Sequence, residues 1–132
     1  MKLKMFTDGG ARGNPGPAAG GAVIYNSQNK ILFSGGKYLG ETTNNVAEYG
    51  ALIFGLEKAQ ELGGTEIECK LDSELLVKQL NGEYKVRDEN LAKLFMKVYS
   101  LQMKFKKITF QHIYREKNSA ADAIVNKILD EK

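Results

Sequence analysis

The sequence predicts an α/β fold in which helices pack on a five-stranded mixed sheet, and two observations carry this prediction. Three strand-like segments come first and are joined by short connections, which is typical of an antiparallel meander. Two later strand-like segments each follow a helical segment, so they are expected to join the sheet in parallel through right-handed crossovers. The order of elements is therefore β-β-β-α-β-α-α-β-α.

The first part of the chain contains short runs that alternate between apolar and polar residues. Leu3 and Met5 alternate with lysines in a strand that ends at Asp8. Six glycines and both prolines fall between Gly9 and Gly21, so this segment is expected to begin as a turn-rich loop. A polar hairpin connection then joins two further strands. The three strands are expected over residues 2–8, 22–25 and 31–34.

The rest of the chain alternates between helices and strands. Apolar residues recur at helical spacing from Val46 to Ala59, and Gly63-Gly64 ends that helix. Asn81-Gly82 ends the next helix, which is shorter. The helices are expected over residues 45–62, 73–80, 88–103 and 119–129, and the strands over residues 66–71 and 108–114.

Length and composition fit one globular domain over residues 1–132. The single cysteine, Cys69, lies in an apolar-alternating run and is expected to be a buried thiol. No apolar run approaches the ~20 residues that a membrane span needs. Met1 to Lys4 leads directly into the first strand, which leaves no room for a signal peptide. We therefore expect a cytoplasmic monomer with no membrane partner.

Basic residues are concentrated in one part of the chain, although the net charge is only +3. Five lysines fall within fifteen residues, at positions 93, 97, 104, 106 and 107. A solvated helix face explains such a run without any ligand, so binding of nucleic acid needs separate evidence.

Four carboxylates stand at the ends of predicted elements, and each has an ordinary structural explanation. Asp8 precedes two glycines, as turn residues do, and Asp72 marks a strand-to-helix junction. Glu48 and Asp122 stand at the spacing of capping carboxylates in the first turns of their helices. Taken singly, each is best explained as a structural residue.

Taken together, the four carboxylates predict a metal site. If the fourth strand lies parallel beside the first, Asp8 and Asp72 emerge at the same edge of the sheet. Converging carboxylates repel one another unless a cation lies among them. Mg²⁺ binds through a few carboxylates and substrate phosphates, and two such ions about 3.5–4 Å apart support phosphodiester hydrolysis. With one histidine and one cysteine, the chain offers little support for a zinc site.

Several motifs resemble those of the ribonuclease HI family, in the same order and over nearly the whole chain. The matching segments are Phe6 to Gly20, Thr42 to Glu48, Leu71 to Ser73 and His112 to Asp122. The first two segments are long and specific, whereas the last two would be weak alone. The resemblance implies a ribonuclease H-like fold with strand order 3-2-1-4-5 and helices on both faces. It also implies an endonuclease that cuts the RNA strand of an RNA–DNA hybrid.

The resemblance assigns roles to individual positions. Asp8, Glu48, Asp72 and Asp122 would hold two Mg²⁺ or Mn²⁺ ions when substrate is bound. The RNA strand and its 2′-hydroxyls would face Gly9, Gly10, Ala11, Arg12, Asn14 and Asn44, with Glu74 as a weaker candidate. Thr43 and Asn45 would stand at a helix start, where Thr43 would hold a phosphate of the DNA strand. Short amides suit a hydroxyl because they both donate and accept hydrogen bonds.

His112 has two interpretations. In the family, a histidine on a loop before the last carboxylate is thought to move protons or to help release product. The alternation of Phe110, His112 and Tyr114 instead predicts a histidine within a strand. Arg115 would then bring a positive charge near the site.

One part of the family pattern is missing. Many members carry a basic, tryptophan-rich protrusion between the two middle helices, but residues 81–87 connect these helices directly and the chain has no tryptophan. Lys85 and Arg87, or the lysines between positions 93 and 107, are candidates to supply the lost phosphate contacts.

Three other functions compete with this interpretation. A resolvase or transposase core would need additional DNA-binding segments, for which one domain of this length has no room. A non-catalytic binding module would be expected to lack at least one of the four carboxylates, but all four are present. A sugar-kinase-like ATPase would need two such domains. In addition, the glycines form neither a Gly-x-Gly-x-x-Gly nor a Walker pattern.

Overall fold

The computed structural model describes residues 1–132 and contains one five-stranded sheet in the order β3-β2-β1-β4-β5. The strands are β1 (Lys2–Ala11), β2 (Gly16–Tyr25), β3 (Ile31–Thr42), β4 (Glu66–Leu71) and β5 (Lys107–His112). The helices are α1 (Asn44–Glu61), α2 (Glu74–Leu80), α3 (Glu89–Gln102) and α4 (Ser119–Asp130), and a short 3₁₀ turn, η1, covers Arg115–Lys117. β1, β2 and β3 pair antiparallel, whereas β4 and β5 add in parallel. The predicted fold class, strand order and element order are confirmed.

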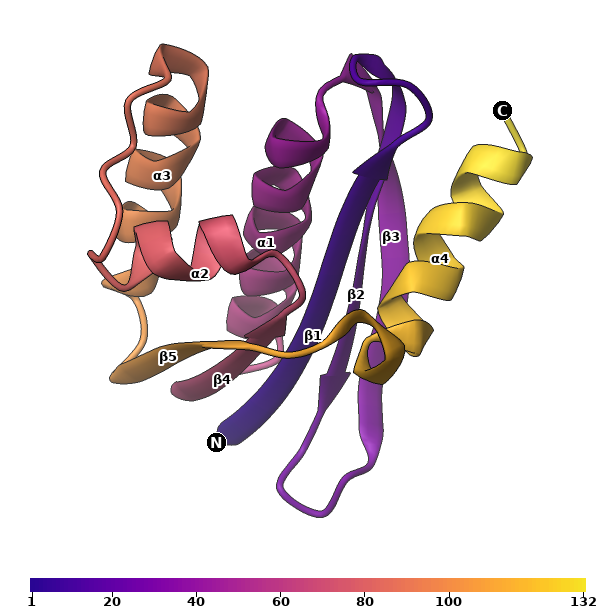
Figure 1. The fold of residues 1–132 in the computed structure, drawn as a ribbon. Helices are drawn as coiled ribbons and strands as arrows, with labels where there is room; N and C mark the ends of the chain where they lie inside the picture. The colour runs from indigo at the N-terminus through magenta and orange to yellow at the C-terminus, as the bar shows by residue number, and fades with distance from the viewer.

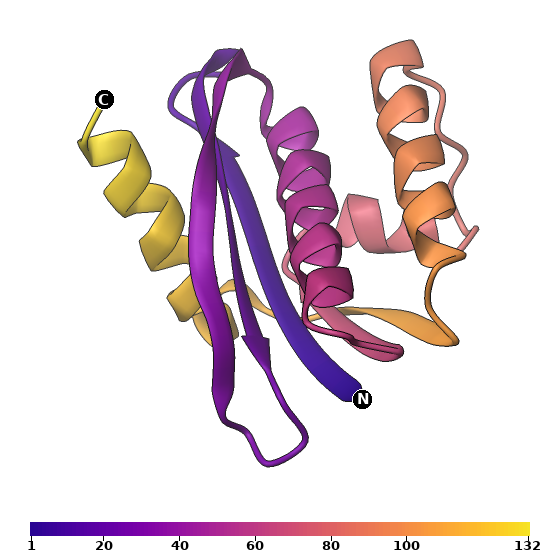
Figure 2. The same cartoon turned by 180° about the vertical axis from the view of Figure 1, so that it is seen from behind.

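Helices cover both faces of the sheet. α1 packs on β1 and β2 from one side, and α4 packs on the same strands from the other side (Figure 1). α3 lies outside α1, so the α1 side is one layer thicker than the α4 side (Figure 2). No helix is both long enough and apolar enough to cross a membrane.

The first three strands are longer than expected, and the predicted loop after Asp8 is wrong. β1 continues to Ala11 and β2 begins at Gly16, so only residues 12–15 form a turn. Gly9, Gly20 and Gly21 lie against helices, whereas Gly13, with a φ of +97°, lies in the turn. A Cβ on Gly9 would lie 2.2 Å from the carbonyl oxygen of Ala47 in α1, and a Cβ on Gly20 would lie 2.8 Å from Ala51. Bare strand backbone therefore allows α1 to approach the sheet closely.

Gly20→Ala is expected to lower the free energy of unfolding by about 1–3 kcal/mol, since the added methyl group meets the backbone of α1. Urea denaturation at neutral pH measures this difference. Gly10→Ala is the matched control, because its Cβ would have Val125 as its nearest neighbour, at an ordinary 3.8 Å. Equal stability of the two variants would contradict the proposed role of Gly20 in packing.

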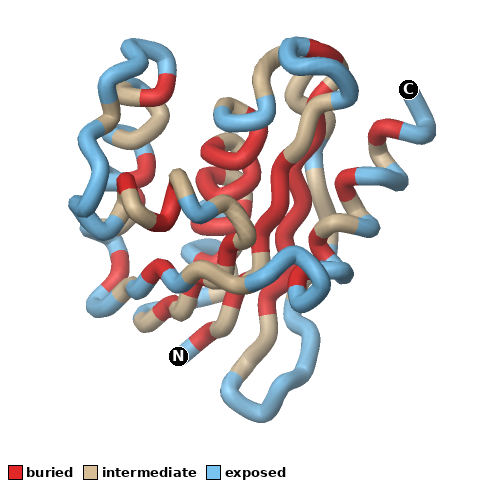
Figure 3. Tube along the Cα trace, viewed as in Figure 1, coloured by how far each residue is buried: buried red, intermediate tan, exposed pale blue.

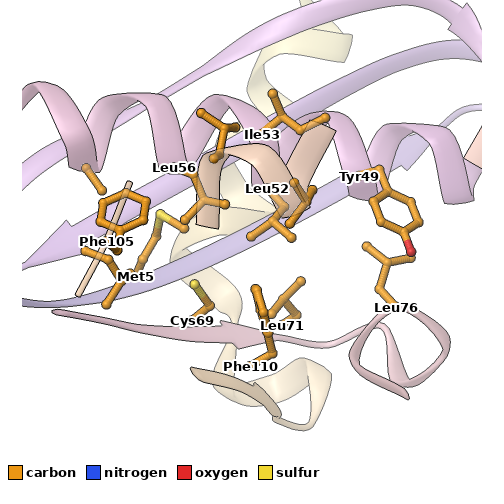
Figure 4. Close-up of a cluster of buried hydrophobic side chains, with 14 of the residues drawn as sticks. Met5, Tyr49, Leu52, Ile53, Leu56, Cys69, Leu71, Leu76, Phe105 and Phe110 are labelled. Atoms are coloured by element: carbon orange, nitrogen blue, oxygen red, sulfur yellow. The ribbon is translucent and has the colours of Figure 1, made fainter. Parts of the chain in front are cut away.

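The main core lies between the sheet and the α1 layer (Figure 3). Leu52 and Leu56 of α1 meet Met5 of β1 and Leu71 of β4 in this core (Figure 4). Cys69 is buried there as predicted, and burial raises the pKa of its thiol. The apolar alternation in β4 therefore places the thiol in the core and leaves Asp72 as the first residue past the strand end.

Candidate metal centre

Asp8 and Asp72 lie side by side because β1 and β4 run in parallel. Thr7 pairs with Leu71 across the two strands, so the next residue of each chain segment is one of the two aspartates. Oxygen atoms of Asp8, Glu48 and Asp72 all lie within 4.8 Å of one another. The expected proximity of Asp8 and Asp72 is confirmed, although only β4 ends there, because β1 continues past Asp8 to Ala11. A helix supplies the third carboxylate.

Glu48 reaches this point from the second turn of α1, not from the first turn as predicted. α1 begins at Asn44, and its N-cap is Thr43, whose hydroxyl accepts a hydrogen bond from the Val46 backbone amide. Glu48 therefore caps nothing, and its Oε1 accepts a hydrogen bond of 3.1 Å from the Gly9 backbone amide. Its Oε2 is buried and has no hydrogen-bond partner.

Asp122 completes the cluster from the first turn of α4, where the sequence places it. It does not cap the helix with Ser119: the N-cap is Asn118, and no side chain caps this helix start. The carboxylate of Asp122 instead lies 3.8 Å from the guanidinium of Arg115 and faces the cleft. All four predicted carboxylates thus line one cleft of about 360 Å³.

The electrostatics of the cluster favour a bound cation. Burial, together with the charges of Asp72 and Asp122, raises the pKa of Asp8 to about 7. Burial and the charge of Asp8 raise the pKa of Glu48 well above its ordinary value. The raised pKa values show that too little positive charge in the protein compensates these carboxylates, and Glu48 Oε2 is buried without a hydrogen-bond donor. Their chemistry fits a divalent ion such as Mg²⁺ or Mn²⁺.

Asn118 connects two parts of the site, and the sequence analysis assigned it no role. Its side chain is 1% exposed, and its Nδ2 donates hydrogen bonds to the Thr7 carbonyl at 2.8 Å and to Asp72 Oδ2 at 3.0 Å. One side-chain amide therefore connects the β1 backbone next to Asp8 with Asp72. A polar residue directly before a predicted helix was the available signal, but capping explains that position equally well.

Asn118→Ala is expected to weaken Mg²⁺ or Mn²⁺ binding by about 10–100-fold, because the carboxylate of Asp72 loses the group that orients it. Isothermal titration of the metal-free protein measures this change directly. Asn81→Ala is the matched control, because Asn81 donates its amide to the Phe110 carbonyl away from the cleft. Metal affinity that stays the same in both variants would rule out an orienting role for Asn118.

The predicted substrate residues divide between two neighbouring hollows. Gly9, Gly10, Ala11, Arg12 and Asn44 line the carboxylate cleft. A second groove of about 290 Å³ is lined by Asn14, Thr43 and Asn45, together with Asp88, Asn90 and Leu91 from the start of α3. One hydrogen bond connects the hollows: Asn14 Oδ1 accepts from the Asn44 backbone amide at 3.0 Å. Within the cleft, Asn44 Oδ1 accepts from the Ala11 backbone amide at 2.8 Å.

Two predicted site residues lie apart from these hollows. Glu74 pairs with Lys78 along α2 at 3.5 Å and does not line the cleft. His112 is the last residue of β5, which ends before the predicted Tyr114, and its ring packs edge-on against Tyr114 with centroids 5.7 Å apart. His112 therefore lies in a strand, and a catalytic role for it stays a prediction. Arg115, in contrast, lines the carboxylate cleft.

Comparisons with known proteins agree with this geometry. A family described as reverse transcriptase-like matches residues 6–128. The chain is 40% identical over 131 residues to a bifunctional protein of Mycobacterium tuberculosis, which covers 98% of this chain and 36% of that protein. It is 39% identical to the ribonuclease HI of Halobacterium salinarum over 98% of this chain and 65% of that protein.

Two solved structures have the same architecture. The crystal structure of RNase H1 from Halobacterium salinarum matches with a TM-score of 0.98 and covers 100% of both chains. LC11-RNase H1, isolated from compost by a metagenomic approach and solved in complex with an RNA/DNA hybrid, matches with a TM-score of 0.93 at 46% identity. That match covers 98% of this chain and 97% of the other.

Proposed function

The chain belongs to the reverse transcriptase-like family, within its ribonuclease H1 members, and on this premise we propose that residues 1–132 form one ribonuclease H domain. The proposed reaction is endonucleolytic hydrolysis of the RNA strand of an RNA–DNA hybrid. The observation that carries the proposal is the meeting of Asp8, Glu48 and Asp72 within 4.8 Å, with Asp122 lining the same cleft. The high identity to RNase H1 proteins over nearly the whole chain supports the choice of substrate.

The four carboxylates would hold two Mg²⁺ or Mn²⁺ ions when substrate is bound. Such ions activate a water molecule and stabilise the leaving oxygen of a phosphodiester. The protein would contribute by holding the carboxylate oxygen atoms in position before the ions bind. The Gly9 amide holds Glu48, and Asn118 holds Asp72, so the donors need little rearrangement on binding.

The two hollows would take the two strands of the hybrid. We assign the RNA strand to the carboxylate cleft, where Asn44 and the backbone from Gly9 to Arg12 lie close enough to read 2′-hydroxyls. We assign a DNA phosphate to the groove at the start of α1, beside Thr43 and Asn45. Asn14 and Asn44 are joined by a hydrogen bond, so the two strand sites are coupled. A contact from Glu74 has less support, because this residue lies outside the cleft.

A role beside the cleft has better support for Arg115 than for His112, because Arg115 lines the cleft and His112 does not. A cytoplasmic location and a monomeric state stay predictions from the sequence.

A cleavage assay on matched RNA–DNA, RNA–RNA and DNA–DNA duplexes, with Mg²⁺ or Mn²⁺, tests the proposal. We expect cutting of the RNA strand of the hybrid and of no other strand. Equal cutting of all three duplexes would indicate a nuclease of the same fold with a different substrate. Binding of the hybrid without any cutting would indicate a non-catalytic module.

A further inference from the structure

Positive charge is segregated in this molecule. Residues 90–115 hold six of the 19 lysines and arginines and none of the 16 aspartates and glutamates. The rest of the chain therefore carries more acidic than basic side chains, although the whole chain is positive. In the fold this segment comprises nearly all of α3, the connection after it and β5.

α3 presents this charge on the side that faces solvent. Its buried residues, Leu91, Val98 and Leu101, face the core, whereas Lys93, Lys97 and Lys104 are exposed. Lys93 and Lys97 follow one stripe of the helix, four residues apart, and Lys104 lies in the turn two residues after the helix ends. None of them forms an ion pair within the protein. Their charge is thus available to an anionic partner.

Large side chains that nothing covers lie beside the lysines. Met96, Tyr99 and Met103 are 56%, 51% and 73% exposed and form an adjacent stripe on the same helix. α3 is the outermost element on its side of the sheet, with α1 between it and the strands (Figure 2). Ser100 follows Lys97 by three residues and Tyr99 lies on the adjacent stripe; both are exposed, and their hydroxyl groups can donate hydrogen bonds to phosphates.

The surface is continuous with the groove already assigned to the DNA strand. Asn90 and Leu91, at the start of α3, line that groove together with Thr43 and Asn45. Lys93 follows two residues later, and the 14-residue helix then extends away from the groove. A helix of this length covers about 21 Å, which corresponds to about six base steps of a nucleic-acid strand.

From these observations we propose that the exposed surface of α3 and of the turn after it, made of Lys93, Lys97, Tyr99, Ser100 and Lys104, binds the sugar–phosphate backbone of the hybrid beyond the groove. The proposal rests on the proposed function, because it takes the RNA–DNA hybrid as the ligand. This surface adds affinity without reading sequence, since lysines and hydroxyls contact phosphates and not base edges. The absence of carboxylates from the segment leaves nothing there to repel a polyanion.

The test measures binding of two hybrids to protein that carries Asp72→Asn, so that bound RNA is not cut. One hybrid of about 10 base pairs fills only the cleft and the groove, and one of about 24 base pairs also reaches α3. The triple variant K93Q/K97Q/K104Q is expected to bind the long hybrid about tenfold more weakly. The slope of log K against log salt should fall by about 2–3, because each lost phosphate contact removes about 0.9. Binding of the short hybrid should change less than twofold.

The charge-matched control is K2Q/K30Q/K37Q, whose lysines are exposed on β1, at the β2–β3 hairpin and on the edge strand β3. This control should leave the affinity for both hybrids and both salt slopes unchanged. The proposed binding surface would be rejected by either of two results. One is an affinity of K93Q/K97Q/K104Q for the long hybrid equal to that of protein with these lysines intact. The other is an equal loss of affinity in the control K2Q/K30Q/K37Q. Hybrid cleavage by protein with Asp72 intact would then still support the proposed function. A failure to bind either hybrid would instead contradict both the proposed function and the proposed binding surface.

Discussion

Asp72→Asn is expected to lower kcat for cleavage of the RNA strand of a hybrid by a factor on the order of 10³ or more. The reason is that Asp72 supplies one of the three carboxylates that meet within 4.8 Å, and an amide there removes a negative charge and an anionic ligand. The side chain keeps nearly the same shape, so the fold and the hydrogen bond from Asn118 have no steric cause to change. Single-turnover cleavage of a labelled hybrid with saturating Mg²⁺ measures the effect on chemistry apart from product release.

The control for this variant is Glu61→Gln, which removes an exposed carboxylate that pairs only with Lys58 at the end of α1. It should cut the hybrid at the unmodified rate. Circular dichroism of both variants should match that of the unmodified protein. If Asp72→Asn leaves turnover unchanged, the proposed metal-dependent mechanism is wrong, however closely the fold resembles RNase H1.

Elements that follow one strong local signal could be predicted almost to the residue. β4 matches its predicted range of 66–71, because polar and apolar residues alternate strictly between Gly64 and the Asp72 junction. α3 lies within its predicted range because Asp88 caps it and an apolar stripe runs along it. Such signals arise from backbone geometry and hydrogen bonding within a few residues.

Elements whose form depends on distant contacts could not be predicted in the same way. Residues 9–11 and 16–21 are glycine-rich, and glycine locally favours turns over strands. In the structure, α1 packs directly on the bare strand backbone at Gly9 and Gly20, as the position of Ala51 against Gly20 shows. The partner that decides the outcome is about 30 residues away in the sequence, so no local pattern contains it.

In the candidate site, too, some features follow from the order of elements and others depend on distant contacts. The meeting of Asp8 and Asp72 follows from parallel strands, which the order of elements already predicts. The turn of α1 that carries Glu48 depends on where that helix begins, and Thr43 caps it two residues earlier than Asn45. The link from Asn118 to Asp72 depends on burial and side-chain direction between the ends of three elements. A sequence pattern locates ligands, but it does not identify the groups that orient them.

Without metal, the protein is expected to become less stable as the pH rises from about 4 to about 7, because of Asp8. The pKa of Asp8 is 3.8 as an ordinary aspartate and about 7 in the folded protein, so the folded state holds a proton that the unfolded state has lost. Stability falls with pH wherever the folded state binds more protons, by at most ~1.4 kcal/mol per pH unit for each proton. The stabilisation from this proton is complete below the pKa of Asp8 in the unfolded state and is lost as the pH rises through the pKa of Asp8 in the folded state. Urea denaturation in a chelator at several pH values measures this slope.

Asp8→Asn should flatten this profile and make the metal-free protein more stable than the unmodified protein at pH 8, since one repelling charge is gone. Asp130→Asn removes an exposed carboxylate instead and should retain the slope. Divalent metal should reverse the trend in the unmodified protein: Mg²⁺ binds the ionised carboxylates and stabilises the folded state by RT ln(1 + [Mg²⁺]/Kd), an effect that grows as the cluster loses its protons. Stability that rises with pH in the chelator, or an equal slope in Asp8→Asn, would mean that the cluster does not hold a proton in place of a metal. The repulsion expected to weaken the metal-free fold at pH 8 would also favour binding of a cation by the cluster.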